Sequence, residues 1–194
     1  MGQMKITPCG ISGLYIIEPK VHGDERGYFY ESYNECDMHA AGLNMHFVQD
    51  NESMSTRGVL RGLHYQKAHP QGKLVRVLQG RVYDVVVDLR TNSPTFGRYC
   101  GVELNAENRK QFYIPPGFAH GYLALSERAV FAYKVTDFYH PEDECGIRWN
   151  DPAIGIDWPD VHGFALTDGT PLNINTRDQN WPCLSSFISQ KEDG

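Results

Sequence analysis

The segment Arg61-Gly62-Leu63-His64-Tyr65-Gln66, together with Gln71-Gly72-Lys73 shortly after it, brings three chemically matched side chains into thirteen residues of sequence. The imidazole of His64 can accept a proton near neutral pH. The guanidinium of Arg61 and the ammonium of Lys73 can hold an anion beside it. This combination suits the removal of a proton next to a carbonyl group in a phosphate-bearing substrate.

Two other roles are open for His64. The first is a metal ligand. A metal-binding barrel would carry a second histidine two positions after His64, where this chain has Gln66. Among the other histidines, only His120 is expected near the end of a strand, where it could supply a second ligand. His64 could also be a barrel-lining residue satisfied by a neighbour. In a regular strand His64 and Arg61 point to opposite faces, so they reach one pocket only if the strand bends, which Gly62 permits.

Further polar residues have both structural and chemical interpretations. Tyr133 fits a strand core, yet a phenol can also deliver a proton. Asp84 shares a strand face with valines and needs a partner, because burying an unpaired carboxylate is costly. Tyr139 could stack on a flat base, and Arg26 and Glu31 could form only a solvated ion pair. The run Gln49-Asp50-Asn51 could end a strand or present amide donors to a phosphate.

The elements that must position these residues are short strands separated by Gly, Pro, Asn and Asp. Alternation along Arg81–Leu89 puts Tyr83, Val85, Val87 and Leu89 on one face and Val82, Asp84, Val86 and Asp88 on the other. Gln79-Gly80 is typical of a hairpin turn. One helix is expected, over Asn34–Ala41, with Asn34 as N-cap. The other expected strands are Tyr28–Tyr33, Phe47–Gln49, Lys73–Leu78, Arg98–Leu104, Lys110–Ile114, Gly121–Ser126 and Val130–Thr136. This spacing predicts an all-β sandwich or jelly-roll barrel with little helix.

The bulk composition agrees with one globular domain over residues 1–194, whose tail after about residue 160 wraps the barrel. Apolar residues make up 41% and charged residues 22%, and no apolar run is long enough to span a bilayer. Five cysteines without a CxxC pair, and no visible leader, predict reduced thiols in a cytoplasmic protein. A net charge of −6 disfavours nucleic acid as a partner, so an anionic ligand needs cations gathered locally.

Several blocks taken together resemble the dTDP-4-dehydrorhamnose 3,5-epimerase family, from about Ile16 to Pro159. The blocks are Gly23-Asp24-Glu25-Arg26-Gly27-Tyr28-Phe29-Tyr30-Glu31, Val48-Gln49-Asp50-Asn51, Arg61-Gly62-Leu63-His64-Tyr65-Gln66, Gln71-Gly72-Lys73-Leu74-Val75, Asp84-Val85-Val86-Val87-Asp88-Leu89-Arg90, Ser93-Pro94-Thr95-Phe96-Gly97, Ile114-Pro115-Pro116-Gly117-Phe118-Ala119-His120-Gly121 and Trp149-Asn150-Asp151-Pro152. The resemblance implies a metal-free, cofactor-free jelly roll of the cupin type. It also implies a homodimer with exchanged strands and a nucleotide-linked 4-keto-6-deoxy sugar as substrate.

The resemblance also implies residue roles. His64 would be the general base, Tyr133 the proton donor on the opposite ring face, and Lys73 the neighbour of the C4 oxygen. Tyr139 would stack on thymine. The substrate contacts would be Arg26, Glu31, Gln49, Asp50, Asn51, Arg61, His120 and Glu144.

The tail departs from the family pattern. The family carries a basic residue followed by an aspartate that pairs with the catalytic histidine. Here Thr176-Arg177-Asp178-Gln179 is similar, with arginine in place of the usual lysine, and the preceding segment aligns poorly. We assign Asp178 as the partner of His64, with Asp84 as the alternative, and place Arg177 among the binding residues. A related enzyme that epimerises one carbon only, a ketoisomerase, and a sugar-binding cupin without activity remain the alternative functions.

Overall fold

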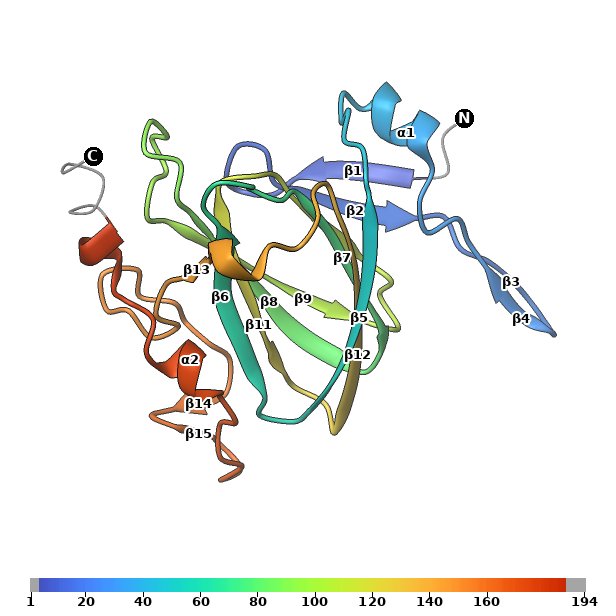
Figure 1. The fold of residues 1–194 in the computed structure, drawn as a ribbon. Helices are drawn as coiled ribbons and strands as arrows, with labels where there is room; N and C mark the ends of the chain where they lie inside the picture. The colour runs from blue at the N-terminus through green and yellow to red at the C-terminus, as the bar shows by residue number, and fades with distance from the viewer. Residues whose placement is uncertain (1–3, 188–194) are drawn as a thin grey trace.

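Two antiparallel sheets face each other in the computed structural model, which describes residues 4–187 (Figure 1). The six-stranded sheet has the order β1 (Met4–Pro8), β2 (Tyr15–Pro19), β10 (Gln111–Ile114), β7 (Lys73–Gln79), β12 (Arg128–Val135), β5 (Gln49–Thr56). The five-stranded sheet has the order β13 (Glu144–Gly146), β6 (Leu60–Gln66), β11 (Phe118–Ala124), β8 (Arg81–Asp88), β9 (Tyr99–Asn105). The expected all-β jelly-roll architecture with little helix is confirmed.

Alternation along β8 separates two apolar cores. Val82 and Val86 point between the sheets and join an interior cluster that includes Phe112 and Phe131. Val85, Val87 and Leu89 point the other way into an outer cluster. The predicted division of this strand into two faces is therefore confirmed. Each such fully buried aliphatic side chain stabilises the fold by roughly 1.5–3 kcal/mol, so the register of β8 fixes both cores at once.

The chain after β13 covers the outer face of the five-stranded sheet (Figure 1, orange to red). It contains a short hairpin, β14 (Val161–His162) with β15 (Ala165–Leu166), and the single-turn helix α2 (Thr176–Gln179). Leu166, Ile174 and Leu184 pack into the outer cluster with Leu60 and Leu63 of β6. This packing delivers the residues of α2 to the end of β6.

The helix α1 (Glu35–Ala40) caps the outer face of the six-stranded sheet. The Asn34 side chain accepts a hydrogen bond from the Asp37 amide, so the predicted helix and its N-cap are confirmed. Met38 is fully buried in a third cluster with Ile17 and Tyr113. No helix within residues 4–187 has the length and apolar character needed to cross a membrane.

Three sequence expectations about strands are wrong. Gly80, with φ of 77°, joins β7 to β8, but these strands lie in different sheets, so the turn carries the chain across the sandwich instead of forming a hairpin. The strand expected at Phe47–Gln49 begins at Gln49 and continues to Thr56 as β5. The strand expected at Tyr28–Tyr33 is replaced by a small hairpin, β3 (His22–Asp24) with β4 (Gly27–Phe29). The strand β5 was not predicted over its full length because it is rich in polar residues. One of its faces lines the cavity described below.

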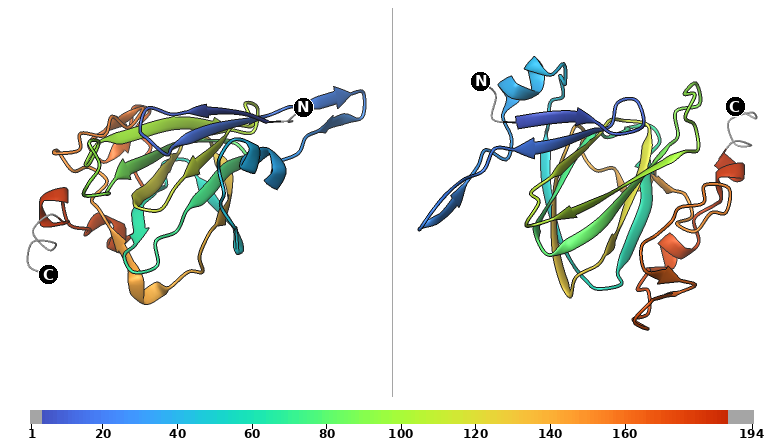
Figure 2. Two further views of the ribbon diagram at one scale, coloured as in Figure 1. Left: turned by 90° about the horizontal axis from the view of Figure 1, so that it is seen from above. Right: turned by 180° about the vertical axis from the view of Figure 1, so that it is seen from behind.

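The β3–β4 hairpin forms an arm that projects from the body of the molecule in all views (Figures 1 and 2). All six of its strand residues are exposed. Tyr28 and Phe29 keep 62% and 68% of their surface accessible, although both are large and apolar. An isolated two-stranded hairpin is marginally stable in water, so the arm has the character of a segment that packs against another surface.

Candidate active site

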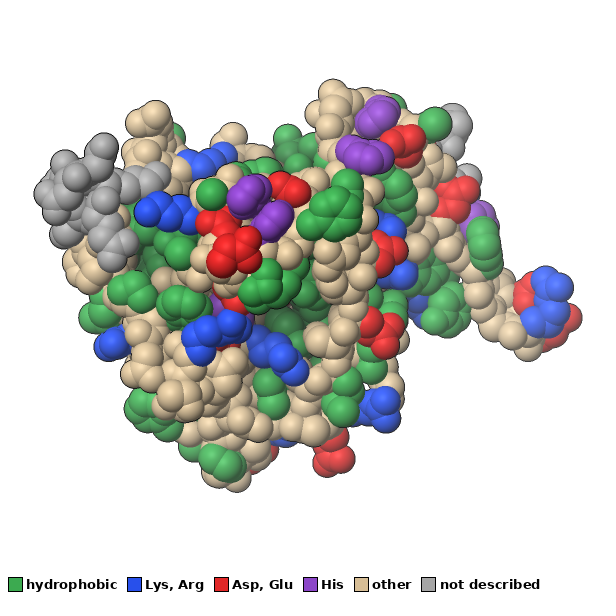
Figure 3. Space-filling view, in the orientation of Figure 1, with side chains coloured by type: hydrophobic (Ala, Val, Ile, Leu, Met, Phe, Trp, Pro, Cys, Tyr) green, Lys and Arg blue, Asp and Glu red, His purple; other side chains and the backbone are tan. Residues whose placement is uncertain are grey.

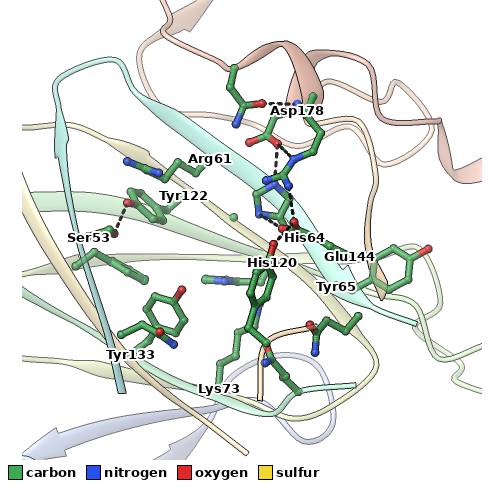
Figure 4. Close-up of a pocket in the computed structure, with 18 of the residues that line it drawn as sticks. Ser53, Arg61, His64, Tyr65, Lys73, His120, Tyr122, Tyr133, Glu144 and Asp178 are labelled. Atoms are coloured by element: carbon green, nitrogen blue, oxygen red, sulfur yellow. Dashed lines mark hydrogen bonds and ion pairs between the residues drawn. The ribbon is translucent and has the colours of Figure 1, made fainter. Parts of the chain in front are cut away.

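A cavity of about 320 Å³ opens between the two sheets. Figure 3 looks toward this face, where charged side chains gather around a hollow, and Figure 4 shows the interior. Most of the predicted site residues line the cavity: Gln49, Asn51, Arg61, His64, Lys73, His120, Tyr133, Tyr139, Glu144, Arg177 and Asp178.

A bulge in the pairing of β6 with β11 lets Arg61 and His64 line the same cavity. His64 stands opposite His120, whereas Arg61 stands opposite Tyr122, and the register shifts between these pairs. Gly62 has φ of 121°, and a Cβ there would lie 2.6 Å from the Cα of Gly121. Only glycine fits this close approach and this conformation. The bend expected at Gly62 is present.

Asp178 binds the far side of the His64 ring. Asn175 caps α2 by accepting a hydrogen bond from the Asp178 amide at 2.7 Å. The Asp178 carboxylate then lies 2.7 Å from His64 Nε2 and accepts a second bond, at 3.0 Å, from the Gly62 amide. Burial by itself raises the pKa of Asp178, but the His64 contacts, the Gly62 amide and Arg177 together hold that pKa below its usual value. An ionised carboxylate accepts a hydrogen bond from the Nε2–H group of His64. The proton then stays on Nε2, and the lone pair of Nδ1 is free to act as a base.

The alternative partner, Asp84, binds His120 instead, at 2.8 Å. Burial raises the pKa of Asp84 and lowers the pKa of His120, and the interaction between the two groups opposes both shifts only in part. Lys73 lies near this pair, and burial lowers the pKa of its ammonium to about 8 against the opposing charges of Asp84 and Glu144. At neutral pH Lys73 is therefore still a cation, although its ammonium group is buried.

Tyr133 enters from the opposite wall. It lies on β12 of the six-stranded sheet, between Asn51 of β5 and Val75 of β7. His64 and His120 come from the five-stranded sheet, so the phenol and the imidazoles belong to facing walls of the cavity (Figure 4). Burial raises the pKa of Tyr133, with a smaller contribution from Tyr122, so its hydroxyl stays protonated at neutral pH.

A chain of hydroxyl groups positions Arg61. Tyr122 OH lies 3.1 Å from Ser53 Oγ and 3.0 Å from Ser55 Oγ, and Ser55 Oγ accepts a bond from Arg61 Nε at 3.1 Å. Tyr122 stacks on Phe131 with ring centroids 4.4 Å apart. The guanidinium is thus fixed at one end of the cavity, away from the Asp178 carboxylate.

Three residues at the mouth form one hydrogen-bonded group. Tyr139 OH donates to Glu144 at 2.7 Å, and Arg177 forms an ion pair with the same carboxylate. The other Glu144 oxygen lies 3.8 Å from His64 Nδ1. Burial alone would lower the pKa of Arg177, but the charge of Glu144 contributes most to a net increase in that pKa. The mouth of the cavity therefore holds a permanent cation, Arg177, and an aromatic ring, Tyr139, close to the imidazole of His64.

Three predicted site residues do not reach this cavity. Arg26 lies at the tip of the arm and forms an ion pair with Asp24. Glu31 accepts a hydrogen bond from Asn34. Asp50 points away from the cavity and binds Lys134, because alternate residues of β5 face opposite sides.

The sequence analysis assigned no role to several residues that line the cavity, chiefly Ser53, Tyr122, Gln71 and Asn175. Alternation along β5 could have found Ser53, because Gln49, Asn51 and Ser53 share one face. Nothing local distinguishes Tyr122 from a core tyrosine. Within residues 4–187 no group of three or more His, Cys, Asp or Glu side chains is arranged to hold a metal ion.

The arrangement can move protons at a carbon atom held between the walls. A base on one wall and an acid on the other allow a proton to leave from one face and return to the opposite face, which inverts the carbon. A cation beside a carbonyl oxygen would stabilise the enolate formed between the two transfers.

Comparison with known proteins points to one group of enzymes. The family model described as dTDP-4-dehydrorhamnose 3,5-epimerase matches residues 8–186. The chain is similar to the protein of that name from Methanothermobacter thermautotrophicus, with 54% identity over 95% of this chain and 96% of the relative. The protein of that name from Pseudomonas aeruginosa is 57% identical over 80% of this chain and 87% of its own length. A crystal structure of the dTDP-6-deoxy-D-glucose-3,5-epimerase of Legionella pneumophila, in complex with dTDP-4-keto-L-rhamnose, superposes with a TM-score of 0.88. That protein is 49% identical, and the match covers 96% of both chains.

Proposed function

The chain belongs to the dTDP-4-dehydrorhamnose 3,5-epimerase family, and from that membership and the geometry of its cavity we propose that it epimerises C3 and C5 of dTDP-4-dehydro-6-deoxy-D-glucose, giving dTDP-4-dehydro-L-rhamnose. The observation that carries the proposal is the convergence of His64, Tyr133 and Lys73 on one cavity from two facing sheets. The protein is an isomerase, and its substrate is a nucleotide sugar.

The reaction begins at a carbon next to the C4 ketone, whose neighbouring protons are acidified by the carbonyl group. Nδ1 of His64 takes the proton, and the bonding electrons move into an enolate whose oxygen lies beside the Lys73 ammonium. The Asp178 carboxylate, at 2.7 Å from Nε2, stabilises the imidazolium that forms. Tyr133 then gives its phenolic proton to the opposite face of the carbon, and exchange with solvent resets both groups. No hydride moves, so the steps require no redox cofactor.

The remaining contacts fall into an inner and an outer group. His120 and Arg61 lie within the cavity near the sugar, and Gln49 and Asn51 line one side of it. Tyr139 and Arg177 at the mouth are suited to the base and the diphosphate, because an aromatic face stacks on thymine and a guanidinium binds phosphate oxygens. We assign Glu144 to hold these two side chains ready for the nucleotide.

Solvent isotope incorporation tests the function. The protein is incubated with dTDP-4-keto-6-deoxyglucose in deuterated water, and the product is read by NMR. Deuterium at both C3 and C5, with inversion at both, is the expected result. Label at one carbon only would identify a single-carbon epimerase, and a shift of the carbonyl along the ring would identify a ketoisomerase. Full turnover by His64→Asn would overturn the assigned base, and absence of turnover by the wild-type protein would leave only a binding role.

We also propose that the protein acts as a homodimer in which the β3–β4 arm reaches the cavity of the partner. Arg26 and Glu31 lie on or next to an exposed arm outside their own cavity, yet the family resemblance assigns both to substrate binding. The exposed rings of Tyr28 and Phe29 supply the apolar surface that such an exchange would bury. Each subunit, residues 1–194, would form a single jelly-roll domain whose tail supplies Asp178.

Mixing two inactive variants tests this exchange. Arg26→Ala removes the arm's cation, and His64→Asn removes the base from the cavity. In a mixed dimer the Arg26→Ala subunit keeps its base and receives an intact arm, so partial activity should return after subunit exchange. No return of activity in dimers shown by affinity tags to be mixed would contradict the exchange, as would a monomer in light scattering.

The five cysteines are all free thiols, which supports our proposal that the protein works in a reducing compartment such as the cytoplasm.

A further inference from the structure

Two of these thiols touch each other at a corner of the sandwich. Cys9 lies in the connection between β1 and β2, and Cys100 lies on β9, 91 positions later in the chain. Their Sγ atoms are 3.0 Å apart. Neither residue lines the catalytic cavity. The contact joins the edge region of the six-stranded sheet to the edge strand of the five-stranded sheet.

The surrounding backbone holds both thiols in place. The Cys9 amide donates to the Leu14 carbonyl at 2.9 Å, and the Cys9 carbonyl accepts from the Ile11 amide at 2.6 Å. Ile11 and Leu14 are buried in the interior cluster, which anchors the loop. Cys100 stands opposite Val86 in the β8–β9 pairing and packs against the same cluster. The two sulfur atoms are therefore held in contact by the fold, and a bond of about 2.05 Å requires only a small approach.

The two thiols also differ in reactivity. The hydrogen bond from Cys100 lowers the pKa of Cys9 to about 7, against the opposing effect of burial. The same hydrogen bond, together with burial, raises the pKa of Cys100. Cys9 thus has substantial thiolate character at neutral pH, while Cys100 stays protonated beside it. Neither residue is fully buried. A nucleophilic thiol next to a second thiol is the arrangement found in redox-responsive cysteine pairs.

We propose that Cys9 and Cys100 form a reversible intramolecular disulfide when the protein meets a low-molecular-weight disulfide such as oxidised glutathione. The Cys9 thiolate attacks one sulfur of the oxidant, forming a mixed disulfide and releasing one glutathione thiolate. That thiolate takes the Cys100 proton. The Cys100 thiolate then attacks Cys9 Sγ and releases the second glutathione. The second glutathione leaves as a thiolate and takes from solvent the proton that Cys9 lost when it ionised. Two electrons pass to the oxidant, whose sulfur–sulfur bond is cleaved, and both halves of it end as thiols.

The bond would clip the two sheets together at their edges. It closes a long loop, so it should stabilise the folded state mainly by restricting the unfolded chain. For a protein of this size we expect the midpoint of thermal unfolding to rise by roughly 5–10 °C. Epimerase activity should stay within about twofold of the reduced protein, because the bond lies outside the cavity.

The experiment compares reduced and glutathione-treated wild-type protein. After treatment, free thiols are blocked under denaturing conditions, and the intact mass and the peptide map are recorded. We expect three blocked thiols where the reduced protein has five, a crosslinked peptide containing Cys9 and Cys100, and a higher unfolding midpoint that dithiothreitol reverses. A stable glutathione adduct on Cys9, a crosslink through another cysteine, or no reaction would overturn the proposal.

Three variants complete the test. Cys100→Ser should trap the glutathione adduct on Cys9, because the second attack cannot occur. Cys9→Ser should abolish both the adduct at this site and the gain in stability. Cys36→Ser removes an exposed cysteine elsewhere and serves as the matched control, which should behave as the wild type does. The wild-type measurement alone decides the proposal if a serine variant folds poorly.

Discussion

Lys73 shows how burial sets the pH range in which a single proposed catalytic group is charged. Its ammonium has a pKa lowered to about 8, because burial outweighs the attraction of Asp84 and Glu144. The charged form therefore dominates below about pH 8 and is lost above it. Since the proposed role of Lys73 is to stabilise an enolate, the reaction needs the charged form.

The activity should accordingly fall on the alkaline side with an apparent pKa near 8. A profile of kcat/KM against pH, which reports the ionising groups of the free enzyme, checks this expectation. Lys73→Arg provides the control, because a guanidinium keeps its charge and should move the alkaline limb well above pH 8. If that variant is inactive, titration of the isotope-labelled Lys73 side chain by NMR measures the same pKa directly. A limb that stays in place in Lys73→Arg would assign the titration to another group.

In the proposed mechanism Asp178 acts on the reaction only through His64. Asp178→Asn keeps the size of the side chain but removes the charge that stabilises the imidazolium and fixes its tautomer. We expect kcat to fall by roughly 10²- to 10⁴-fold with little change in KM. Asp168→Asn is the matched control, because Asp168 is a tail carboxylate that pairs with Arg57 outside the cavity. Equal losses in the two variants would show that the tail, and not the dyad, was disturbed.

At the scale of elements, the site depends on the close approach of β6 and β11. The bulge between these strands turns Arg61 and His64 toward one cavity. Gly62 and Gly121 face each other at its centre, and a Cβ on Gly121 would lie 2.4 Å from the Arg61 carbonyl oxygen. The two strands would have to separate to admit it.

Gly121→Ala should therefore lower the free energy of unfolding by about 1–3 kcal/mol, as overpacking of a filled interior does. Chemical denaturation measures that loss, and kcat should fall with it because His64 and Arg61 lie on the displaced strand. Gly23→Ala is the control, because the nearest atom to a Cβ there is 3.5 Å away and the residue lies in the exposed arm. A Gly121→Ala protein as stable as the wild type would refute the close approach.

For the molecule as a whole, the packing of the tail supports the geometry of the proposed site. Ile174 is buried in the outer cluster, and Asp178 lies four residues later. The apolar contacts of the tail therefore hold the carboxylate against His64. A tail that detached from the sheet would expose the outer cluster and remove the partner of the base in one event.

Ile174→Ala should cost about 2–5 kcal/mol of stability and also reduce kcat at temperatures well below unfolding. Leu104→Ala is the matched control, because Leu104 is also buried but belongs to the interior cluster, whereas Ile174 and the tail pack into the outer cluster. The control should lose comparable stability and keep its kcat. Thermal unfolding with parallel rate measurements separates the two effects, and an unchanged kcat in Ile174→Ala would contradict the coupling.

Local sequence patterns were enough to predict the elements whose side chains follow a simple period. Alternation in β8 defined two faces, Asn34 identified the start of α1, and the spacing of short strands between turn residues predicted an all-β sandwich or jelly roll. The motif around His64 also indicated proton removal next to a carbonyl group, because it combines an imidazole base with a guanidinium and an ammonium that can hold an anion. These features are local, so they can be read from neighbouring residues.

The contacts between distant residues depend on how the sheets and the tail pack. Gly80 joins two sheets instead of forming a hairpin, and Asp50 points outward although its neighbours Gln49 and Asn51 line the cavity. Asp178 reaches His64 across 114 positions of sequence, and Tyr133 faces it from the other sheet. Such contacts arise from burying apolar faces against each other over the whole chain. Local patterns fix which side of a strand a residue occupies, whereas only the packing of the sheets and the tail fixes what lies opposite it.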